Sequence, residues 1–344
     1  MEDVRRPFAV FSHSEAAMPR DQFDREINYL RISLTDHCNL RCVYCMPLDG
    51  LRFLARQDLL NAAEIAEVAR VAVAAGFRKF RLTGGEPTLR PDVVEIVERL
   101  SQIEGVGDLA MTTNGVLLPA LARPLAEAGL QRVNIHLDTL HPERLAQIMR
   151  WGSVDLIWQG IEAAEEAGLT PMKLNTVVAR GYNDCDVVEL AALTRHRDWH
   201  CRFIEMMPFG EGECVATARN QYVSNDEVRA RIEGELGPLM PVAGSPSDEA
   251  VNYRLEGARG IVGFISPVSA PYCGSCNRMR LTADGKLHLC LLNDDEMDIK
   301  KQLREHGPEA VYEILLRAVR NKPMGHRLHE GIFTQQRRMF QIGG

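Results

Sequence analysis

The stretch YLRISLTDHCNLRCVYC, residues 29–45, places three closely spaced cysteines directly after an apolar, β-rich run. The run YLRISLT (29–35) predicts a strand, and Cys38, Cys42 and Cys45 follow it in a C-x3-C-x2-C spacing. In α/β barrels the side chains that carry chemistry lie on the loops that follow the strands. The spacing therefore predicts a functional metal site at the carboxyl end of the first strand.

Five more β-rich runs follow, and amphipathic helical patterns separate them. Together with the first run, the strands are expected at residues 29–35, 79–83, 108–113, 132–138, 172–178 and 201–206. The helices are expected at residues 62–75, 91–102, 119–128, 142–149, 154–167 and 184–195. Six βα units predict a parallel sheet with right-handed crossovers. Since eight units are not reached, we expect an α/β fold, a partial (β/α)6 TIM-like barrel.

Glycine and proline mark several ends of the expected helices. Gly76, Gly129 and Gly168 stand where helix C-caps belong. Pro91 has a suitable place at the first position of its helix. These residues support the helix boundaries given above.

The regular alternation stops after Met206. Residues 208–260 are rich in Gly, Pro and short polar stretches, and a β-rich segment with a turn at Asp284-Gly285 follows. A helical tail is expected from about residue 295 to residue 320. We therefore expect three parts, which are an N-terminal arm (1–24), a barrel (25–207) and a smaller C-terminal domain that closes the barrel mouth (208–344).

Composition and charge exclude several classes of protein. The chain has 344 residues, a net charge of −7 and 45% hydrophobic residues. A global basic surface for nucleic acid is absent, so an anionic substrate needs a local group of Arg or Lys. No apolar run approaches the roughly 18–20 residues of a membrane helix. The opening MEDVRRPFAVFSHSEAAMPR has no apolar core and carries early acidic residues, so we expect no secretory or transit signal and a cytoplasmic protein.

Nine cysteines are present, and an odd number does not favour a disulfide framework. Six of them form two groups, the C-x3-C-x2-C run and a C-x2-C-x13-C set made of Cys273, Cys276 and Cys290. The remaining three are scattered, and of these Cys201 is expected to be buried packing at the start of a strand. Clustered thiols in a cytosolic chain indicate metal binding.

Each group supplies three thiolates, which suits two kinds of metal site. Three thiolates can hold three irons of a cubic [4Fe–4S] cluster and leave the fourth iron open for a small chelating ligand. A structural zinc ion, the alternative, takes four ligands, and His37 or His288 would supply the fourth beside the first or the second group. Since C-x2-C is a common zinc knuckle, zinc is the stronger alternative at the second group. We interpret both groups as cluster sites, and the zinc alternative stays open.

Six basic residues lie in or near expected strands, where a charge is costly unless it is paired. They are Arg31, Arg81, Lys173, Arg202, Arg278 and Arg280. In an extended chain Arg278 and Arg280 point to one face. Converging guanidiniums bind phosphate oxygens in a bidentate manner, so we interpret the set as a receptor for a polyphosphate. Salt-bridged surface charge is the alternative for any one of them, and no Walker A loop supports a P-loop NTPase.

Several motifs taken together resemble one known family. They are the C-x3-C-x2-C run, RLTGGEP (81–87), TTNG (112–115), VNIHLD (133–138), RFIEMM (202–207), GFISPVSAPYCGSCNRMRLTADGKLHLCL (263–291) and the terminal QIGG (341–344). The cysteine run and the GGE after the second strand are similar to the radical S-adenosylmethionine (SAM) superfamily. The whole set, from about residue 22 to the C-terminus, resembles the GTP 3′,8-cyclase family, also called molybdenum cofactor biosynthesis protein A.

The resemblance implies two [4Fe–4S] clusters and SAM as cofactors. The implied cluster ligands are Cys38, Cys42 and Cys45 for the first cluster and Cys273, Cys276 and Cys290 for the second. The implied SAM contacts are Tyr44, Gly85, Glu86, His136 and Met207. The implied GTP contacts are Arg31, Arg81, Thr112, Lys173, Arg202, Arg278, Met279 and Arg280, of which Arg31, Arg278 and Arg280 are also implied to be catalytic. The family further implies that a Gly-Gly tail, Gly343 and Gly344, reaches toward the active site.

The resemblance also implies a reaction, that of a lyase in the first step of molybdenum cofactor biosynthesis. A 5′-deoxyadenosyl radical from SAM takes the hydrogen from C3′ of GTP, and the new carbon radical adds to C8 of guanine. The implied product is (8S)-3′,8-cyclo-7,8-dihydroguanosine 5′-triphosphate. The implied partners are an electron donor and cyclic pyranopterin monophosphate synthase, which receives the product. A second copy of the chain is a further candidate partner.

Three positions depart from the family pattern. His37 stands where arginine is usual, His136 where serine is usual, and PFGEGE (208–213) where the family often has DVGN. Two other functions are alternatives. A peptide-modifying radical SAM maturase would carry more C-terminal cysteines and fewer arginines, and a zinc-binding module without activity would contain no iron.

Overall fold

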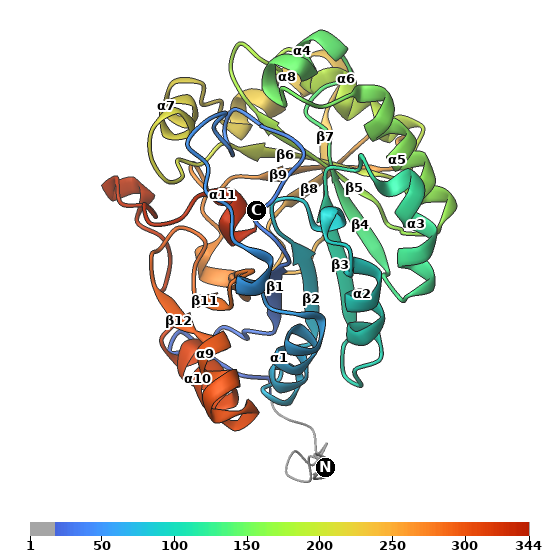
Figure 1. Ribbon diagram of the computed structural model, residues 1–344. Helices are drawn as coiled ribbons and strands as arrows, with labels where there is room; N and C mark the ends of the chain where they lie inside the picture. Colours follow the sequence, from blue (N-terminus) through green and yellow to red (C-terminus); the bar gives the residue numbers. More distant parts are fainter. Residues whose placement is uncertain (1–17, 344) are drawn as a thin grey trace.

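The computed structural model describes residues 18–343, and their strands form a 12-stranded sheet (Figure 1). The strand order is β12-β11-β10-β1-β2-β3-β4-β5-β6-β9-β8-β7, and the sheet is not closed. Its six central strands are parallel and are β1 (Tyr29–Ser33), β2 (Lys79–Thr83), β3 (Asp108–Thr113), β4 (Arg132–His136), β5 (Lys173–Val178) and β6 (His200–Glu205). The expected partial barrel is confirmed.

One helix follows each of β1, β2, β3 and β5, and two helices follow β4. They are α1 (Ala62–Ala74, which precedes β2), α2 (Val93–Ser101), α3 (Leu118–Glu127), α4 (Pro142–Ile148), α5 (Val154–Glu166) and α6 (Val187–Ala192). In Figure 1 the helices α1 to α5 lie outside the strands. Gly76, Gly129 and Gly168 have φ angles of 97°, 104° and 75° just past the ends of their helices, which confirms them as capping glycines.

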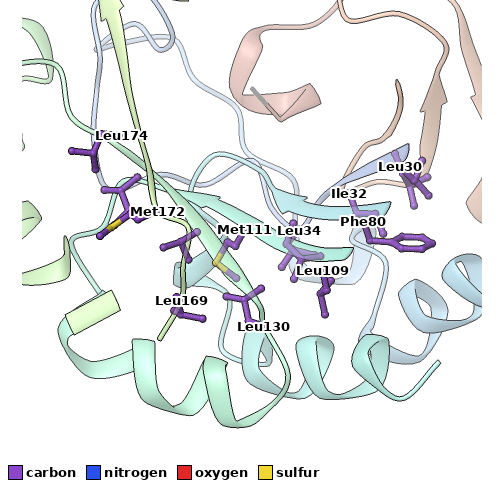
Figure 2. Close-up of a cluster of buried hydrophobic side chains, with 14 of the residues drawn as sticks. Leu30, Ile32, Leu34, Phe80, Leu109, Met111, Leu130, Leu169, Met172 and Leu174 are labelled. Atoms are coloured by element: carbon purple, nitrogen blue, oxygen red, sulfur yellow. The ribbon is translucent and has the colours of Figure 1, made fainter. Parts of the chain in front are cut away.

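Strand residues alternate between an apolar outer face and a polar inner face. On β1, Leu30 and Ile32 pack in the main core, while Arg31 between them faces the barrel interior. Figure 2 shows part of this outer layer, with Leu30, Phe80 and Leu109 among its side chains. Burying each such side chain contributes about 1.5–3 kcal/mol, so the outer layer holds the strands to the helices and the inner face is left for polar groups.

The C-terminal part of the chain extends the barrel sheet from both of its edges. On one side β9 (Ile261–Ile265) pairs with β6 in parallel, and β8 (Val251–Leu255) and β7 (Leu239–Val242) follow. On the other side β10 (Arg278–Leu281) pairs with β1 in parallel, and β11 (Lys286–His288) and β12 (Glu296–Asp298) follow, after the expected turn at Asp284-Gly285. The second cysteine group thereby comes to lie beside the first strand. The expected boundary between the barrel and the C-terminal domain, at residues 207 and 208, stays a prediction.

Three local expectations were wrong. The segment expected to be irregular contains α7 (Glu213–Asn220) and α8 (Asn225–Leu236), and α2 begins at Val93, so that Pro91 precedes the helix. The expected helical tail divides into β12, α9 (Ile299–His306) and α10 (Pro308–Arg320), because Gly307 has a φ of 80° and Pro308 starts a new helix. The short helix α11 (Met339–Ile342) follows. The remaining helical turns, of the 3-10 type, are Arg56–Asp58, Pro87–Leu89, Leu193–Arg195, Cys273–Ser275 and Leu328–Glu330.

The expected N-terminal arm covers residues 1–24, of which 1–17 lie outside the described residues. Within residues 18–24 Asp21 is buried, while Met18 and Phe23 are exposed. Asp21 and Arg25 form a buried ion pair of 2.6 Å, and Arg25 also donates to the carbonyl oxygens of Cys273 (2.7 Å) and Met324 (2.8 Å). The described part of the arm is thus anchored at Asp21, and Arg25 supports the loop that carries the second cysteine group. No helix among residues 18–343 has both the length and the apolar character needed to cross a membrane.

Candidate active site

The parallel register brings three arginines together on the inner face of the barrel. Arg31 on β1 pairs with Arg81 on β2 and with Arg280 on β10. All three are buried, and all three line one large cavity, which we call the barrel cavity. Arg278 lies two residues from Arg280 on the same strand and is buried as well, as the i, i+2 spacing predicted. A row of guanidiniums inside a barrel is a binding surface for an anion.

The first cysteine group opens into the same barrel cavity, which Cys38, Cys42 and Cys45 line together. Backbone bonds hold their loop against the end of α4, with Arg41 N donating to Met149 O at 3.2 Å and Val43 N to Ile148 O at 2.9 Å. Burial raises the pKa of the Cys38 thiol to about 11. Metal binding at this site therefore has to displace protons from the thiols.

The spacing of the thiols distinguishes the two kinds of metal site. Sulfur ligands lie about 2.3 Å from a zinc ion, which puts them about 4 Å from one another. Among residues 18–343, the one set of three His, Cys, Asp or Glu donor atoms within 4.8 Å of one another is His141, Asp186 and Glu189. Neither cysteine group meets this limit. The thiols of neither group are therefore spaced as ligands of one zinc ion in this structure.

The histidines that the zinc alternative needs are also turned elsewhere. The His37 ring stacks on Phe53 with ring centroids 4.4 Å apart, and it is half exposed. His288 Nε2 lies 3.0 Å from a carboxylate oxygen of Glu296. Neither histidine lines the cavities that the thiols line.

The second cysteine group lines a further space, which we call the C-terminal cavity. Burial alone would raise the pKa of the Cys276 thiol, but the positive charges of Lys322 and Arg278 outweigh burial and lower it to about 6. Lys322 is buried and donates to the carbonyl oxygens of Arg278 (2.8 Å) and Leu289 (2.5 Å). The surroundings of Cys276 therefore favour the thiolate that a cluster iron needs.

The residues expected to contact SAM lie around the first thiol group. Tyr44, Gly85, Glu86, His136 and Met207 all line the barrel cavity. A Cβ on Gly85 would lie 2.3 Å from the carbonyl oxygen of His37, so only glycine fits there. The loop after β2 therefore packs directly on the chain that leads into the first cysteine group.

Glu86 is tied into the protein by hydrogen bonds. Its Oε1 accepts from Thr88 N (3.0 Å) and Thr113 Oγ1 (2.7 Å), and its Oε2 accepts from Asn114 N (2.7 Å). Burial is the main cause of a raised pKa at this carboxyl, and these bonds oppose it. Glu86 thus joins the loops after β2 and β3, and the contact to SAM that was expected of it stays a prediction.

His136 belongs to a network at the end of β4. Its Nε2 lies 2.5 Å from Tyr44 Oη and 2.9 Å from Asp138 Oδ2, and Tyr44 donates to the same carboxylate oxygen at 2.7 Å. The network joins β4 to the loop that carries the first thiol group. His136 therefore has a positioning contact that serine would be too short to make.

Among the residues expected to contact GTP, Lys173 and Arg202 line a third space between the barrel strands, which we call the basic cavity. Burial and the nearby Arg202 lower the pKa of Lys173 to about 8. Thr112 lines the barrel cavity, and Arg81 donates to its hydroxyl at 3.5 Å. Met279 was expected in the site, but its side chain is fully buried in the core and lines none of the three cavities.

The C-terminal tail ends against the barrel strands. Arg280 donates a hydrogen bond to the carbonyl oxygen of Gly343, whose φ is 81°. A Cβ on Gly343 would overlap the side chain of Thr83 at the end of β2. Gly344, the other tail residue, lies outside the described residues.

Several residues that the sequence analysis did not single out line the cavities, and four of them bear on the chemistry. They are Glu249, Tyr272, Lys322 and His326. His326 Nδ1 accepts from Leu328 N at 3.3 Å, and its Nε2 is buried without a partner among the described residues. Glu249 and Lys322 lie in turn-rich polar stretches, where charged residues are ordinary. The sequence holds no strong local signal for them.

The comparisons with known proteins agree with this geometry. The family model of the radical SAM superfamily matches residues 32–194, and the model described as Molybdenum Cofactor Synthesis C matches residues 199–328. In solved structures, Streptococcus suis SuiB covers the chain with a TM-score of 0.62 at 14% identity, over 88% of this chain and 68% of that one. SuiB bound to S-adenosylmethionine gives a TM-score of 0.59 at 12% identity, over 87% and 69%. At these identities the likeness shows the fold alone.

Curated relatives are much more similar. GTP 3′,8-cyclase of Moorella thermoacetica is 49% identical over 327 residues, which are 94% of this chain and 100% of the relative. The enzyme of the same name from Pelotomaculum thermopropionicum is 48% identical over 330 residues, again 94% of this chain and 100% of the relative. The chain therefore belongs to the GTP 3′,8-cyclase family of the radical SAM superfamily.

Proposed function

We propose that this protein is a GTP 3′,8-cyclase, which joins C3′ of the ribose to C8 of guanine and so begins molybdenum cofactor biosynthesis. The observation that carries the proposal is the row of buried arginines, Arg31, Arg81 and Arg280, between two groups of three thiols. The names of its relatives support GTP as the substrate. A polyphosphate held by the arginines would place one nucleotide within reach of both groups.

In this proposal Cys38, Cys42 and Cys45 hold one [4Fe–4S] cluster, and SAM binds in the barrel cavity beside it. When bound, the cluster and SAM together supply the one-electron chemistry that removes a hydrogen atom from ribose C3′. The protein holds the ribose next to them and keeps bulk water out of the barrel. At this end of the barrel Gly85 packs on the cysteine loop, and the Tyr44 network joins that loop to β4.

The arginines hold the triphosphate. Arg31 Nε and Arg278 Nη2 are buried and have no hydrogen-bond partner among the described residues. An unpartnered buried donor is costly, and a phosphate oxygen would satisfy it. Arg31, Arg278 and Arg280 all line the C-terminal cavity with the second thiol group, and Arg31 and Arg280 also line the barrel cavity with the first. We therefore propose that they orient the nucleotide during the reaction.

The second group, Cys273, Cys276 and Cys290, would hold the other [4Fe–4S] cluster, and its three thiolates would leave a position free for the nucleotide. Among the residues lining the C-terminal cavity there is no fourth cysteine. We therefore propose two clusters per chain. We also propose that the enzyme is a lyase.

The test is turnover under anaerobic conditions. Protein reconstituted with iron and sulfide is mixed with GTP, SAM and a reductant, and 5′-deoxyadenosine and GTP are both measured. We expect 5′-deoxyadenosine to appear and GTP to be consumed in step. Release of 5′-deoxyadenosine without loss of GTP would favour the maturase alternative, and protein without iron would leave the zinc-binding alternative.

We further propose the setting in which the enzyme works. Nine thiols without disulfides suit the reducing cytoplasm. A one-electron donor must supply the first cluster, and cyclic pyranopterin monophosphate synthase would take the product. A second copy of the chain remains a candidate partner, and sedimentation of the reconstituted protein would establish whether it dimerises.

A further inference from the structure

One acidic side chain lies inside the arginine row. Glu249 lies near the end of the loop of residues 243–250, between β7 and β8, and its side chain is 14% exposed. It lines the barrel cavity, the basic cavity and the C-terminal cavity alike. Glu249 therefore occupies the point where the three spaces meet.

Three arginines share the carboxylate of Glu249. Its Oε2 lies 2.5 Å from Arg31 Nη2 and 3.3 Å from Arg278 Nη1, and its Oε1 lies 3.5 Å from Arg202 Nη1. Burial would raise the pKa of this carboxyl, but Arg31, Arg278 and Arg202 hold it well below its usual range. The carboxylate is charged at neutral pH and partly neutralises the cations around it.

The same arginines are the ones proposed above to hold the triphosphate. A buried carboxylate and a phosphate oxygen on one guanidinium would repel each other strongly, because the interior screens charge poorly. The two anions therefore compete for Arg31 and Arg278. Glu249 contacts Arg31 Nη2 and Arg278 Nη1, so a phosphate oxygen that binds the unpartnered Arg31 Nε and Arg278 Nη2 would lie beside a buried carboxylate, which favours withdrawal of Glu249.

We propose that Glu249 is a placeholder for the substrate's phosphates, which pairs with the arginines in the free enzyme and moves out when GTP binds. The inference rests on the proposed function. In the free enzyme the carboxylate stabilises a group of buried cations that would otherwise be unpaired. Glu249 also makes binding selective, since an anion must compete with its carboxylate to reach the arginines. A single phosphate ion competes poorly with Glu249 for the arginines. A triphosphate contacts several guanidiniums at once and therefore displaces the carboxylate.

The loop that carries Glu249 is placed so that it can move. Residues 243–246 are exposed, and β7 is the last strand at its edge of the sheet. Asp248 Oδ2 accepts from Ser245 N at 3.0 Å, so the loop keeps its own internal bond whether or not Glu249 is in place. Withdrawal of Glu249 needs no change in the central strands.

The test compares binding to the reconstituted protein and to its Glu249→Gln variant, with GTP, inorganic triphosphate and guanosine as ligands. We expect the variant to bind GTP and triphosphate about tenfold more tightly, because the competing charge is gone, and to bind guanosine unchanged. Glu256→Gln is the matched control, since Glu256 is exposed in the turn that follows β8, and it should leave all three affinities as they were.

Weaker binding of GTP by Glu249→Gln would show that the carboxylate supports the arginines and would overturn the proposal. Unchanged GTP affinity would also overturn it, while the cyclase function would stand. If neither GTP nor triphosphate binds to any variant, the proposed function fails as well.

A second measurement uses the unmodified protein, in case the variant folds poorly. Amide hydrogen exchange of residues 243–250 is followed before and after triphosphate is added. We expect exchange to become faster when triphosphate displaces Glu249. Slower or unchanged exchange at saturating triphosphate would contradict the proposal.

Discussion

Lys173 is a lysine inside a barrel strand, where its charge depends on its surroundings. Burial and nearby Arg202 lower its pKa to about 8, so it carries a charge below that pH and loses it above. If Lys173 binds phosphate, GTP affinity should fall as pH rises from about 7 to about 9. The loss of one charge-assisted hydrogen bond corresponds to about tenfold. Titration of GTP binding across this range measures it.

Lys173→Arg is the control for this prediction. A guanidinium stays charged throughout the range, so the variant should show a flatter pH profile than the unmodified protein. Identical profiles for the two proteins would mean that Lys173 does not contact the phosphates.

At the scale of single residues, the sequence predicted the site residues that are unusual where they stand, such as a charged residue in an apolar strand. Arg31 and Arg81 stand out because a charge inside an apolar strand needs an explanation, and the structure puts them side by side. Glu249 is an acidic residue in a polar loop, and such a residue needs no explanation. It becomes a candidate for function only through its contacts with three arginines that are distant in the sequence.

The loop between β2 and α2 shows how closely neighbouring elements pack around the first thiol group. A Cβ at Gly85 would lie 2.3 Å from His37 O and 2.8 Å from Asp36 O, both backbone atoms that cannot move alone. Gly85→Ala should destabilise the fold by about 3 kcal/mol and lower iron binding at the first group. Chemical denaturation and iron content measure the two effects.

Gly234→Ala is the matched control at this scale. Gly234 lies within α8, and a Cβ there would meet nothing within 4 Å. The substitution should stabilise the protein by up to about 1 kcal/mol. A Gly85 variant as stable as the Gly234 variant would argue against the close packing of the cysteine loop.

Helices and strands were predictable where burial of one face gives the sequence a regular spacing of apolar residues. The barrel strands and helices matched their expected ranges within a few residues, because each strand has an apolar outer face and each helix covers it. The helices α7 and α8 were missed because their sequences are polar, with few buried residues to mark a face. Gly307 and Pro308 are signals in the sequence for the end of one helix and the start of another, but the sequence analysis predicted a single helical tail.

At the scale of the whole molecule, a residue near the end of the chain packs against the barrel strands. Gly343 lies between Arg280 and Thr83 and has a φ that favours glycine. Gly343→Ala should push the tail away from the barrel. We expect GTP turnover to fall at least about tenfold, since small displacements near reacting groups are costly, while iron content and stability stay the same.

Gly331→Ala provides the comparison. Gly331 also has a positive φ, of 75°, but a Cβ there would meet nothing within 4 Å. Its turnover should match that of the unmodified protein. Equal turnover in the Gly343 and Gly331 variants would show that the tail has no part in the reaction.

The pairing of the C-terminal strands could not be read from the sequence. β9 and β10 join opposite edges of the barrel, each in parallel with a strand far away in the chain. No local pattern encodes which edge a strand will join. The sequence predicted two metal-binding groups, and this pairing is what brings them to adjoining cavities.

The measurement that tests the account most directly is the iron content of the protein reconstituted under anaerobic conditions, together with two variants in which either cysteine group is changed to alanine. Two cubic clusters predict about eight irons per chain in the unmodified protein and about four in each variant. One zinc ion at each group, or no bound iron in any of the three proteins, would contradict it.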